Sequence, residues 1–187
     1  MSADAAPEIR TERLLLRPQR PADADAVTAL AARREVAATT LHIPHPYSAS
    51  DARVWIERSL SDRASGRSCG FAITLAESSL LVGAIGLRMD PDPRSAELGY
   101  WIGVPHWGQG YATEAARAVT DYGFDTLGLE RIYGQHFTEN PGSGRVLENA
   151  GLRYEGTLRG HVAKWGERKD VAVYGLSRSD RHNSGSG

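Results

Sequence analysis

The chain has 187 residues, of which 41% are hydrophobic and 24% are charged. This composition is typical of one folded domain and excludes a disordered or collagen-like chain. The formal net charge of −1 excludes the strongly basic surface of most nucleic-acid binders, so we expect neither nucleic acid nor a membrane as partner. Cys69 is the single cysteine, which rules out an intramolecular disulfide and a cysteine zinc cluster.

No stretch is long and apolar enough for a transmembrane helix, and the first residues lack the pattern of a signal peptide. We therefore expect a cytoplasmic protein with one domain over residues 1–187. Both ends are small and polar, and we expect residues 1–8 and 178–187 to be disordered.

The first elements are indicated by short apolar runs and by capping residues. Residues 14–16 form an apolar run that stops at Pro18 and predicts a strand. Pro21 opens a helix, and the capping-box spacing of Ser48 and Asp51 predicts the start of another. Three apolar segments follow at residues 69–76, 80–89 and 95–104, and their short connections favour an antiparallel meander.

From Gly108 the apolar residues recur every three or four positions, which predicts a helix of about four turns that ends at Gly128. A strand is predicted at residues 131–139, and Asn140 before Pro141 begins a short helix that Gly151 closes. Strands at residues 152–158 and 171–176 complete the chain. The fold class is α+β, with three α/β/α layers, a mixed, mostly antiparallel sheet of about six or seven strands and about four helices.

An apolar strand runs through a glycine-containing turn directly into the longest predicted helix. The turn has no Lys, Arg, Asp or Glu, so main-chain N–H groups are its polar donors, and Gly108 and Gly110 permit close approach. Negative charge is favoured at a helix N-terminus, and the segment predicts a phosphate or pyrophosphate site. A Walker loop would need a lysine after Gly108, where this chain has Gln109. A dinucleotide fingerprint would need Gly or Ala where this chain has Thr113, so neither site is expected.

The sequence WGQGYATEA at residues 107–115 resembles motif A of the GNAT superfamily of acyl-CoA N-acyltransferases, [QR]-x-x-G-x-[GA], with Trp107 at its first position. A tryptophan there is common in the RimJ/RimL-like branch, which acetylates protein N-termini and various small amines. The segments TERLLLRP, IPHPYS, ELGYWI and NPGSGRVLENAGL resemble the same branch in the same order, so the resemblance extends over roughly residues 11–176.

The resemblance implies the GNAT fold, with acetyl-CoA as cosubstrate and no metal ion. The strand before the turn would splay from its neighbour, and Trp101 and Ile102 would offer main-chain groups to the pantetheine and the thioester. Asn140 and Ser143 would lie at the thiol end, where Ser143 stabilises the departing thiolate. The pyrophosphate would be held by Trp107, Gly108, Gln109, Gly110, Tyr111, Ala112 and Thr113. Many relatives place a tyrosine general acid where this chain has Leu147, which leaves the acid unassigned.

The implied reaction is direct attack of a neutral amine on acetyl-CoA. Deprotonating an α-amine at pH 7 costs about 1.4 kcal/mol, whereas a lysine-type amine costs roughly 4.6 kcal/mol, so an N-terminal acceptor needs only a weak base. Glu97 is the first candidate for the base, with His106 and Glu139 as alternatives. Glu114 is better explained by the helix dipole, because it lies in the first helical turn.

The aromatic residues beside a polar loop predict one wall of an acceptor pocket, formed by His42, Tyr47 and Trp55, although Trp55 in the core is an equal alternative. His42 and His45 lack the spacing of a helical metal site. Two further functions stay open: a non-catalytic acyl-CoA-binding or regulatory module, and an acyltransferase with a larger donor such as succinyl-CoA. The acceptor is a protein N-terminal α-amine or a small-molecule amine, and pairing of late strands into a homodimer follows from the resemblance.

Overall fold

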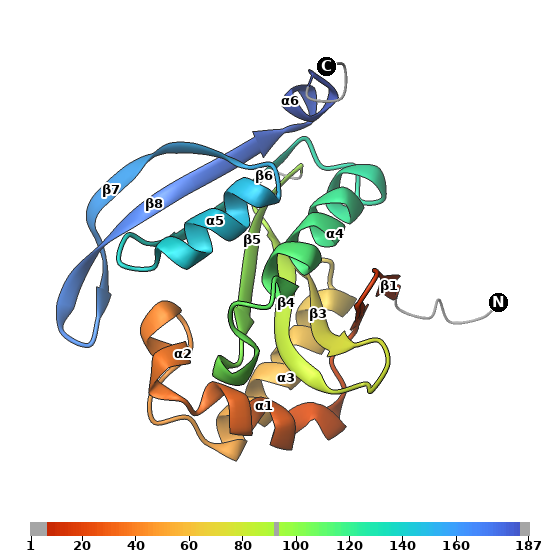
Figure 1. The fold of residues 1–187 in the computed structure, drawn as a ribbon, viewed down its shortest axis with the longest axis vertical. Coiled ribbons are helices and arrows are strands. Elements are labelled where there is room, and N and C mark those ends of the chain that lie inside the picture. Colours follow the sequence, from red (N-terminus) through yellow and green to blue (C-terminus); the bar gives the residue numbers. More distant parts are fainter. Residues whose placement is uncertain (1–6, 92–93, 184–187) are drawn as a thin grey trace.

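The computed structural model describes residues 7–91 and 94–183. Over these residues the chain forms one sheet of eight strands in the order β1-β2-β3-β4-β5-β6-β8-β7, together with six α-helices (Figure 1). The predicted α+β fold with a mixed sheet is confirmed, with slightly more strands and helices than expected. Residues 1–6 and 184–187 of the predicted tails lie outside the described residues.

The first five strands form an antiparallel series, as the short connections predict. They are β1 Ile9–Arg10, β2 Leu14–Arg17, β3 Ser68–Leu75, β4 Leu81–Met89 and β5 Ser95–Ile102. Between β2 and β3 lie a 3-10 turn at Pro21–Asp23 and the helices α1 Ala24–Ala31, α2 Arg34–Thr39 and α3 Ala49–Ala64. The predicted cap begins α3, because the Ser48 hydroxyl accepts from the Asp51 N–H and the Ser48 N–H donates to the Asp51 carboxylate.

The second part of the chain crosses over to add three more strands. A 3-10 turn at Val104–His106 leads to α4 Tyr111–Asp125, which is followed by β6 Arg131–Phe137, α5 Pro141–Asn149, β7 Arg153–Lys164, β8 Glu167–Ser177 and α6 Arg178–Asn183. β6 is parallel to β5 and antiparallel to β8. In the β7–β8 hairpin the register shifts twice, between Tyr154 and Gly156 and between Leu158 and Val162.

Helices cover both faces of the sheet. The larger core lies where α4 and α5 pack on the sheet, and it contains fully buried Phe71, Leu87, Ile132 and Leu147. A smaller core lies under α1 and α3, around Ile56. Among the described residues, no helix is both long and apolar enough to span a bilayer.

β5 and β6 pair only at their N-terminal ends. The parallel register joins Ser95 to Arg131, Ala96 to Ile132 and Glu97 to Tyr133, and no later pair follows within the described strands. The C-terminal halves, residues 98–102 and 134–137, therefore separate, and we call this region the splay. The strand separation that the family resemblance implies is present.

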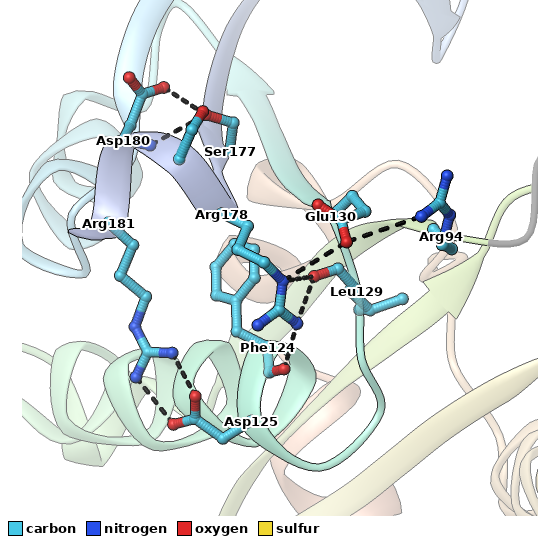
Figure 2. Close-up of polar contacts among 10 residues, drawn as sticks. Arg94, Phe124, Asp125, Leu129, Glu130, Ser177, Arg178, Asp180 and Arg181 are labelled. Carbon is cyan, nitrogen blue, oxygen red and sulfur yellow. Dashed lines mark hydrogen bonds and ion pairs between the residues drawn. The ribbon is translucent and has the colours of Figure 1, made fainter. Parts of the chain in front are cut away.

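Arg178–Asn183, within the segment expected to be disordered, form α6. Figure 2 shows Arg178 of α6 donating to the main-chain carbonyls of Phe124 and Leu129, and Arg181 bonding Asp125. The polar composition predicts a loose tail, but the two guanidinium groups find partners at the C-terminal end of α4. These charged hydrogen bonds offset the entropy lost on ordering α6.

Candidate active site

The glycine turn carries a row of unused main-chain donors. Gly108 and Gly110 have φ values of 73° and 80°, a left-handed conformation that glycine adopts without steric cost. Gly110 is the N-cap of α4, and no side chain caps this helix. Within the described structure, the N–H groups of residues 108–113 donate to no protein acceptor. These donors and the helix dipole favour an anion at the turn.

A guanidinium group that sequence reasoning missed lies against the same turn. Arg13 donates to the Gln109 carbonyl at 3.0 Å, and its guanidinium carbon lies 4.9 Å from the centre of the Tyr111 ring. An open cavity of about 750 Å³ adjoins it, lined in part by Arg13, Gly110, Thr113 and Arg117. The sequence gives no signal for this contact, because β2 and α4 meet only through the sheet topology.

Glu114 is fully engaged in holding the chain near β2 to α4. Its carboxylate accepts from the Thr11 hydroxyl at 2.6 Å, the Arg13 N–H at 2.8 Å and the Arg13 Nε at 2.7 Å. Burial by itself would raise the pKa of the Glu114 carboxyl, but the hydrogen bonds from Thr11 and Arg13 hold this pKa below its usual value. Glu114 is thus a structural anion, which agrees with its placement in the first helical turn.

At the other end of the splay, the predicted polar pair lies at the start of α5. Asn140 caps this helix by accepting from the Ser143 N–H at 3.4 Å. The Ser143 hydroxyl lies 2.6 Å from the Tyr100 hydroxyl of β5, which also donates to the Ser143 carbonyl at 3.1 Å. Burial raises the pKa of Tyr100 to about 12, so this phenol remains protonated at neutral pH.

Tyr100 is a second residue that sequence reasoning missed. It lies within the ELGYWI segment, but its link to Ser143 crosses the splay and leaves no trace in sequence spacing. Leu147, at the position of the relatives' acid, is 1% exposed and packs in the larger core. The hydroxyl nearest to Ser143 therefore comes from β5 rather than from α5.

Glu97 lies on the opposite face of β5 from Tyr100, since the two are three residues apart on a strand. Its carboxylate accepts from Gln135 Nε2 at 2.7 Å and pairs with Arg88. The side chain is 15% exposed. The structure thus brings Glu97 to the edge of the splay but holds both carboxylate oxygens in hydrogen bonds.

The other base candidates lie farther along the chain. Glu139 precedes the Asn140 cap, is 67% exposed and pairs with Lys169 at 3.1 Å. His106 ends the 3-10 turn before the glycine turn and is partly buried. Neither side chain has the enclosed position of Glu97.

The two residues predicted to offer main-chain groups to the pantetheine lie on opposite sides of β5. The Trp101 carbonyl faces β4, where it would lie 2.2 Å from a Cβ atom at Gly83, so it points away from the splay. The Ile102 carbonyl accepts from the Trp107 indole N–H at 2.7 Å and is already occupied. Because main-chain groups alternate sides along a strand, those of Leu98, Tyr100 and Ile102 point toward β6, whereas those of Trp101 point toward β4.

The residues predicted for the acceptor wall gather on the face opposite α4 and α5. Tyr47, Trp55 and Trp101 pack against the smaller core, with the Trp55 and Trp101 ring centres 6.3 Å apart. Burial raises the pKa of Tyr47 to about 12. Burial and the nearby positive charge of Arg88 lower the pKa of His42, which keeps this imidazole neutral at pH 7.

Known proteins resemble this chain in sequence and show its family. The acetyltransferase (GNAT) domain family matches residues 13–153. An uncharacterized N-acetyltransferase, p20 of Bacillus licheniformis, is 33% identical over 171 residues, which cover 91% of this chain and 96% of p20.

Two solved structures extend the likeness to the fold. The structure of a GNAT-family acetyltransferase from Bacillus anthracis superposes with a TM-score of 0.84 at 26% identity, over 92% of this chain and 99% of that one. RimL, a ribosomal L7/L12 α-N-protein acetyltransferase in complex with coenzyme A, superposes with a TM-score of 0.83 at 18% identity, over 93% of this chain and 99% of RimL. At that identity the RimL likeness concerns the fold alone.

Proposed function

Because the chain belongs to the GNAT acetyltransferase family, with RimJ/RimL-like relatives, we propose that it transfers the acetyl group of acetyl-CoA to a primary amine. The acceptor is a protein N-terminal α-amine or a small-molecule amine. The observation that carries the proposal is the uncapped start of α4, with its consecutive free N–H groups beside the splay.

In this proposal the glycine turn holds the pyrophosphate of acetyl-CoA. Main-chain N–H groups of residues 108–113 donate to the phosphate oxygens, and the α4 dipole adds favourable charge. Arg13 supplies a cation at the rim of the turn. The pantetheine then lies along β5 in the splay, with main-chain contacts to Leu98 and Tyr100 rather than to Trp101.

The chain's own residues divide the proton transfers between the two faces of the sheet. Tyr100 and Ser143 lie on the α5 side, and Glu97 lies on the other side with the acceptor wall. The amine nitrogen forms a bond to the acetyl carbon as the carbon–sulfur bond breaks. Ser143 gives its hydroxyl proton to the leaving thiolate and regains one from Tyr100, which takes a proton from solvent water before the next turnover. The amine's surplus proton leaves through water that Glu97 orients.

The hydrogen bonds of Glu97 fit an α-amine acceptor. Both oxygens of the Glu97 carboxylate already accept hydrogen bonds, from Arg88 and from Gln135. Glu97 is therefore better suited to orient a water molecule than to accept the amine proton directly. An α-amine is partly neutral at pH 7 and needs little more than this. The proposal therefore favours α-amines over lysine-type amines.

Gly110→Trp tests the cofactor end of the proposal. The indole would enter the space in front of the free N–H groups, and calorimetry should show a loss of coenzyme A affinity of at least about 100-fold, or 2.7 kcal/mol. Gly128→Trp is the matched control, because Gly128 has a similar φ of 70° and open space around it, at the far end of α4. Circular dichroism checks the fold of both variants. Equal coenzyme A binding by the two variants would overturn the placement of the phosphate site.

Thiol release with a panel of peptides and amines tests the reaction. We expect turnover with acetyl-CoA and an α-amine, and its loss in Glu97→Gln and Ser143→Ala. Coenzyme A binding without turnover for any acceptor would instead identify a binding module. Faster release from succinyl-CoA than from acetyl-CoA would assign the larger donor.

A further inference from the structure

A cavity of about 320 Å³ lies between α2 and the turn of the β7–β8 hairpin, and we call it the hairpin pocket. Figure 1 shows the hairpin extending past the sheet toward α2. The lining residues are Arg34, Ala38, Glu139, Lys164, Trp165, Glu167 and Lys169. Of these, only Glu139 is a site candidate from the sequence.

Trp165 has an unusual backbone conformation for a large side chain. It has a φ of 52° and begins the two-residue turn that Gly166, with a φ of 82°, completes. Asn, Asp and Gly are the residues that such hairpin turns prefer, and a bulky residue there is strained. The side chain is also 48% exposed, so burial in the core does not explain it.

Two positive charges at the pocket have no acidic partner among the described residues. Lys164 is only 8% exposed, and its ammonium group donates to the main-chain carbonyls of Ile43 and Leu41 at 2.9 and 3.3 Å. The ammonium nitrogen also lies 5.3 Å from the centre of the Trp165 ring. The Arg34 guanidinium lies 4.9 Å from the centre of the Trp165 ring and forms no ion pair in the described structure.

The third cation of the pocket differs from these two. Lys169 pairs with Glu167 at 2.8 Å and with Glu139 at 3.1 Å, so these three side chains together carry a net charge of −1. Arg34 and Lys164 bring the charged lining of the pocket to a net charge of +1, next to an aromatic face. Burial lowers the pKa of Lys164, and a bound anion would favour its charged form again.

Two contacts link the pocket to the elements that carry the proposed site. Lys164 holds the carbonyls on both sides of His42, in the loop that continues to Tyr47 on the acceptor wall. Glu139 directly precedes Asn140, the cap of the helix that carries Ser143. A molecule seated in the pocket can therefore extend along this loop toward the splay.

We propose that the hairpin pocket binds an anionic group of the acceptor, so that the substrates are amines whose molecules also carry a carboxylate or a phosphate. The anion lies between Arg34 and Lys164, and a planar or apolar part of the acceptor packs on Trp165. This proposal deepens the proposed function. It rests on that function because the bound molecule is identified as the amine acceptor of the transfer. The anion site itself can be measured without acetyl-CoA.

Nuclear magnetic resonance of the tryptophan indole N–H groups tests the site directly. The probes are benzoate, phenyl phosphate and the neutral analogue benzamide, added to the protein without acetyl-CoA. We expect at least one anion to shift the Trp165 signal saturably and benzamide to leave it unchanged; the better-bound anion identifies the source. The signal is assigned by its loss in Trp165→Asn. Equal binding of benzamide, or no saturable binding of either anion, would overturn the proposal.

Charge-removing variants separate this site from a general surface effect. Arg34→Gln and Lys164→Met should each weaken anion binding at least tenfold, whereas Arg33→Gln, the same change outside the pocket lining, should not. Arg34 is exposed, so Arg34→Gln remains informative even where Lys164→Met disturbs the loop. Unchanged anion binding in Arg34→Gln would contradict the proposal.

Trp165→Asn distinguishes a binding role from a structural one. Asn tolerates the left-handed conformation, so this variant should unfold at the same temperature as the wild type or higher while it binds the anion more weakly. A lower unfolding temperature with unchanged anion binding would mean that Trp165 serves the fold.

Matched acceptors join the site to the reaction. Amines that carry a carboxylate or phosphate should be acetylated with a lower KM than their neutral amides or alcohols, and Arg34→Gln should remove the difference. Gly110→Trp should lose coenzyme A binding and keep anion binding, so that failure of the phosphate site and failure of the anion site give separate results. Equal KM values for charged and neutral acceptors in the wild type would contradict the proposal.

Discussion

Arg17 and Asp23 form a buried ion pair near the start of the chain. Their side chains are 10% and 9% exposed, and Arg17 Nη2 lies 2.7 Å from Asp23 Oδ1. The Arg20 N–H donates to the same carboxylate at 2.7 Å. Burial alone would raise the pKa of Asp23, but the bonds from Arg17 and Arg20 hold it below the usual value. The pair joins β2 to the turn that starts α1.

Asp23→Asn should lower the free energy of unfolding by about 3–5 kcal/mol, because it leaves the Arg17 charge buried without its partner. The folded-state pKa of Asp23 is depressed, so its contribution is present above the unfolded value of about 3.9 and is lost as the pH falls through the folded value. Urea unfolding at pH 7 and at pH 3 should therefore show a smaller difference between wild type and variant at the lower pH. A constant difference would contradict the assignment.

Ser143→Ala should reduce kcat by roughly 100-fold with little change in the KM for acetyl-CoA, since proton transfer in the transition state is what it removes. Tyr100→Phe should reduce kcat less, and combining the two should cost little more than Ser143→Ala alone. Steady-state kinetics with thiol detection measure both. Tyr154→Phe is the control, because it removes the same hydroxyl from an exposed tyrosine. A Tyr100→Phe enzyme with wild-type kcat would remove Tyr100 from the mechanism.

The sequence could predict residues whose role depends on local spacing. Asn140 and Ser143 are one helical turn apart, so their pairing is readable from the chain. Tyr100 and Arg13 act through partners 43 and 96 positions away, and only the folded sheet brings them there. The side of β5 to which the Trp101 main-chain groups point is likewise not readable from the sequence, because alternation along a strand has no fixed phase there.

At the scale of elements, α4 has two unlike ends. Its N-terminal N–H groups have no partner in residues 7–91 and 94–183, whereas Arg178 of α6 covers the C-terminal end by donating to the carbonyls of Phe124 and Leu129 (Figure 2). A cation is favourable at that end because of the helix dipole. The protein satisfies one end internally, and the other end is the proposed phosphate site.

Arg178→Met should lower the free energy of unfolding by about 2 kcal/mol, since it keeps the apolar stem but leaves carbonyl groups without their charged donor. Thermal or urea unfolding measures the change, and Arg159→Met on exposed β7 is the matched control. Coenzyme A affinity should not change, because Arg178 lies at the far end of α4. Equal stability of both variants would show that α6 contributes nothing to α4.

The sequence predicts those elements that have a capping residue or an apolar periodicity of their own. The caps at Ser48 and Asn140 and the helical period after Gly108 have physical causes within a few residues. β1 and α2, with two and six residues, are too short for any period to show. β7 extends to Lys164 although its side chains are mostly exposed, so its outer half lacks the apolar alternation of a half-buried strand.

At the scale of the molecule, the splay divides the sheet into two parts. β1 to β5 and β6 to β8 are joined through a parallel ladder of three residue pairs. The proposed binding of acetyl-CoA fills this separation and bridges both parts. No local sequence pattern predicts such a break, because it depends on where two distant strands stop pairing.

Coenzyme A should therefore stabilise the whole protein, by about 2.7 kcal/mol at a concentration 100 times its Kd. Hydrogen exchange should slow most at residues 98–102, 108–113 and 134–137, on both sides of the splay and in the turn. Mass spectrometry of the exchanged peptides measures this. Protection confined to the hairpin pocket, with no change in the turn, would place coenzyme A elsewhere.

The two register shifts in β7 affect how this molecule meets other chains. β7 is the outer strand of the sheet, and its twelve residues would offer a long template for a strand from another molecule. Each shift breaks that template and increases the local twist, so a foreign strand can align over only a few residues at a time. The register shifts of β7 thus disfavour aggregation through the open edge of the sheet.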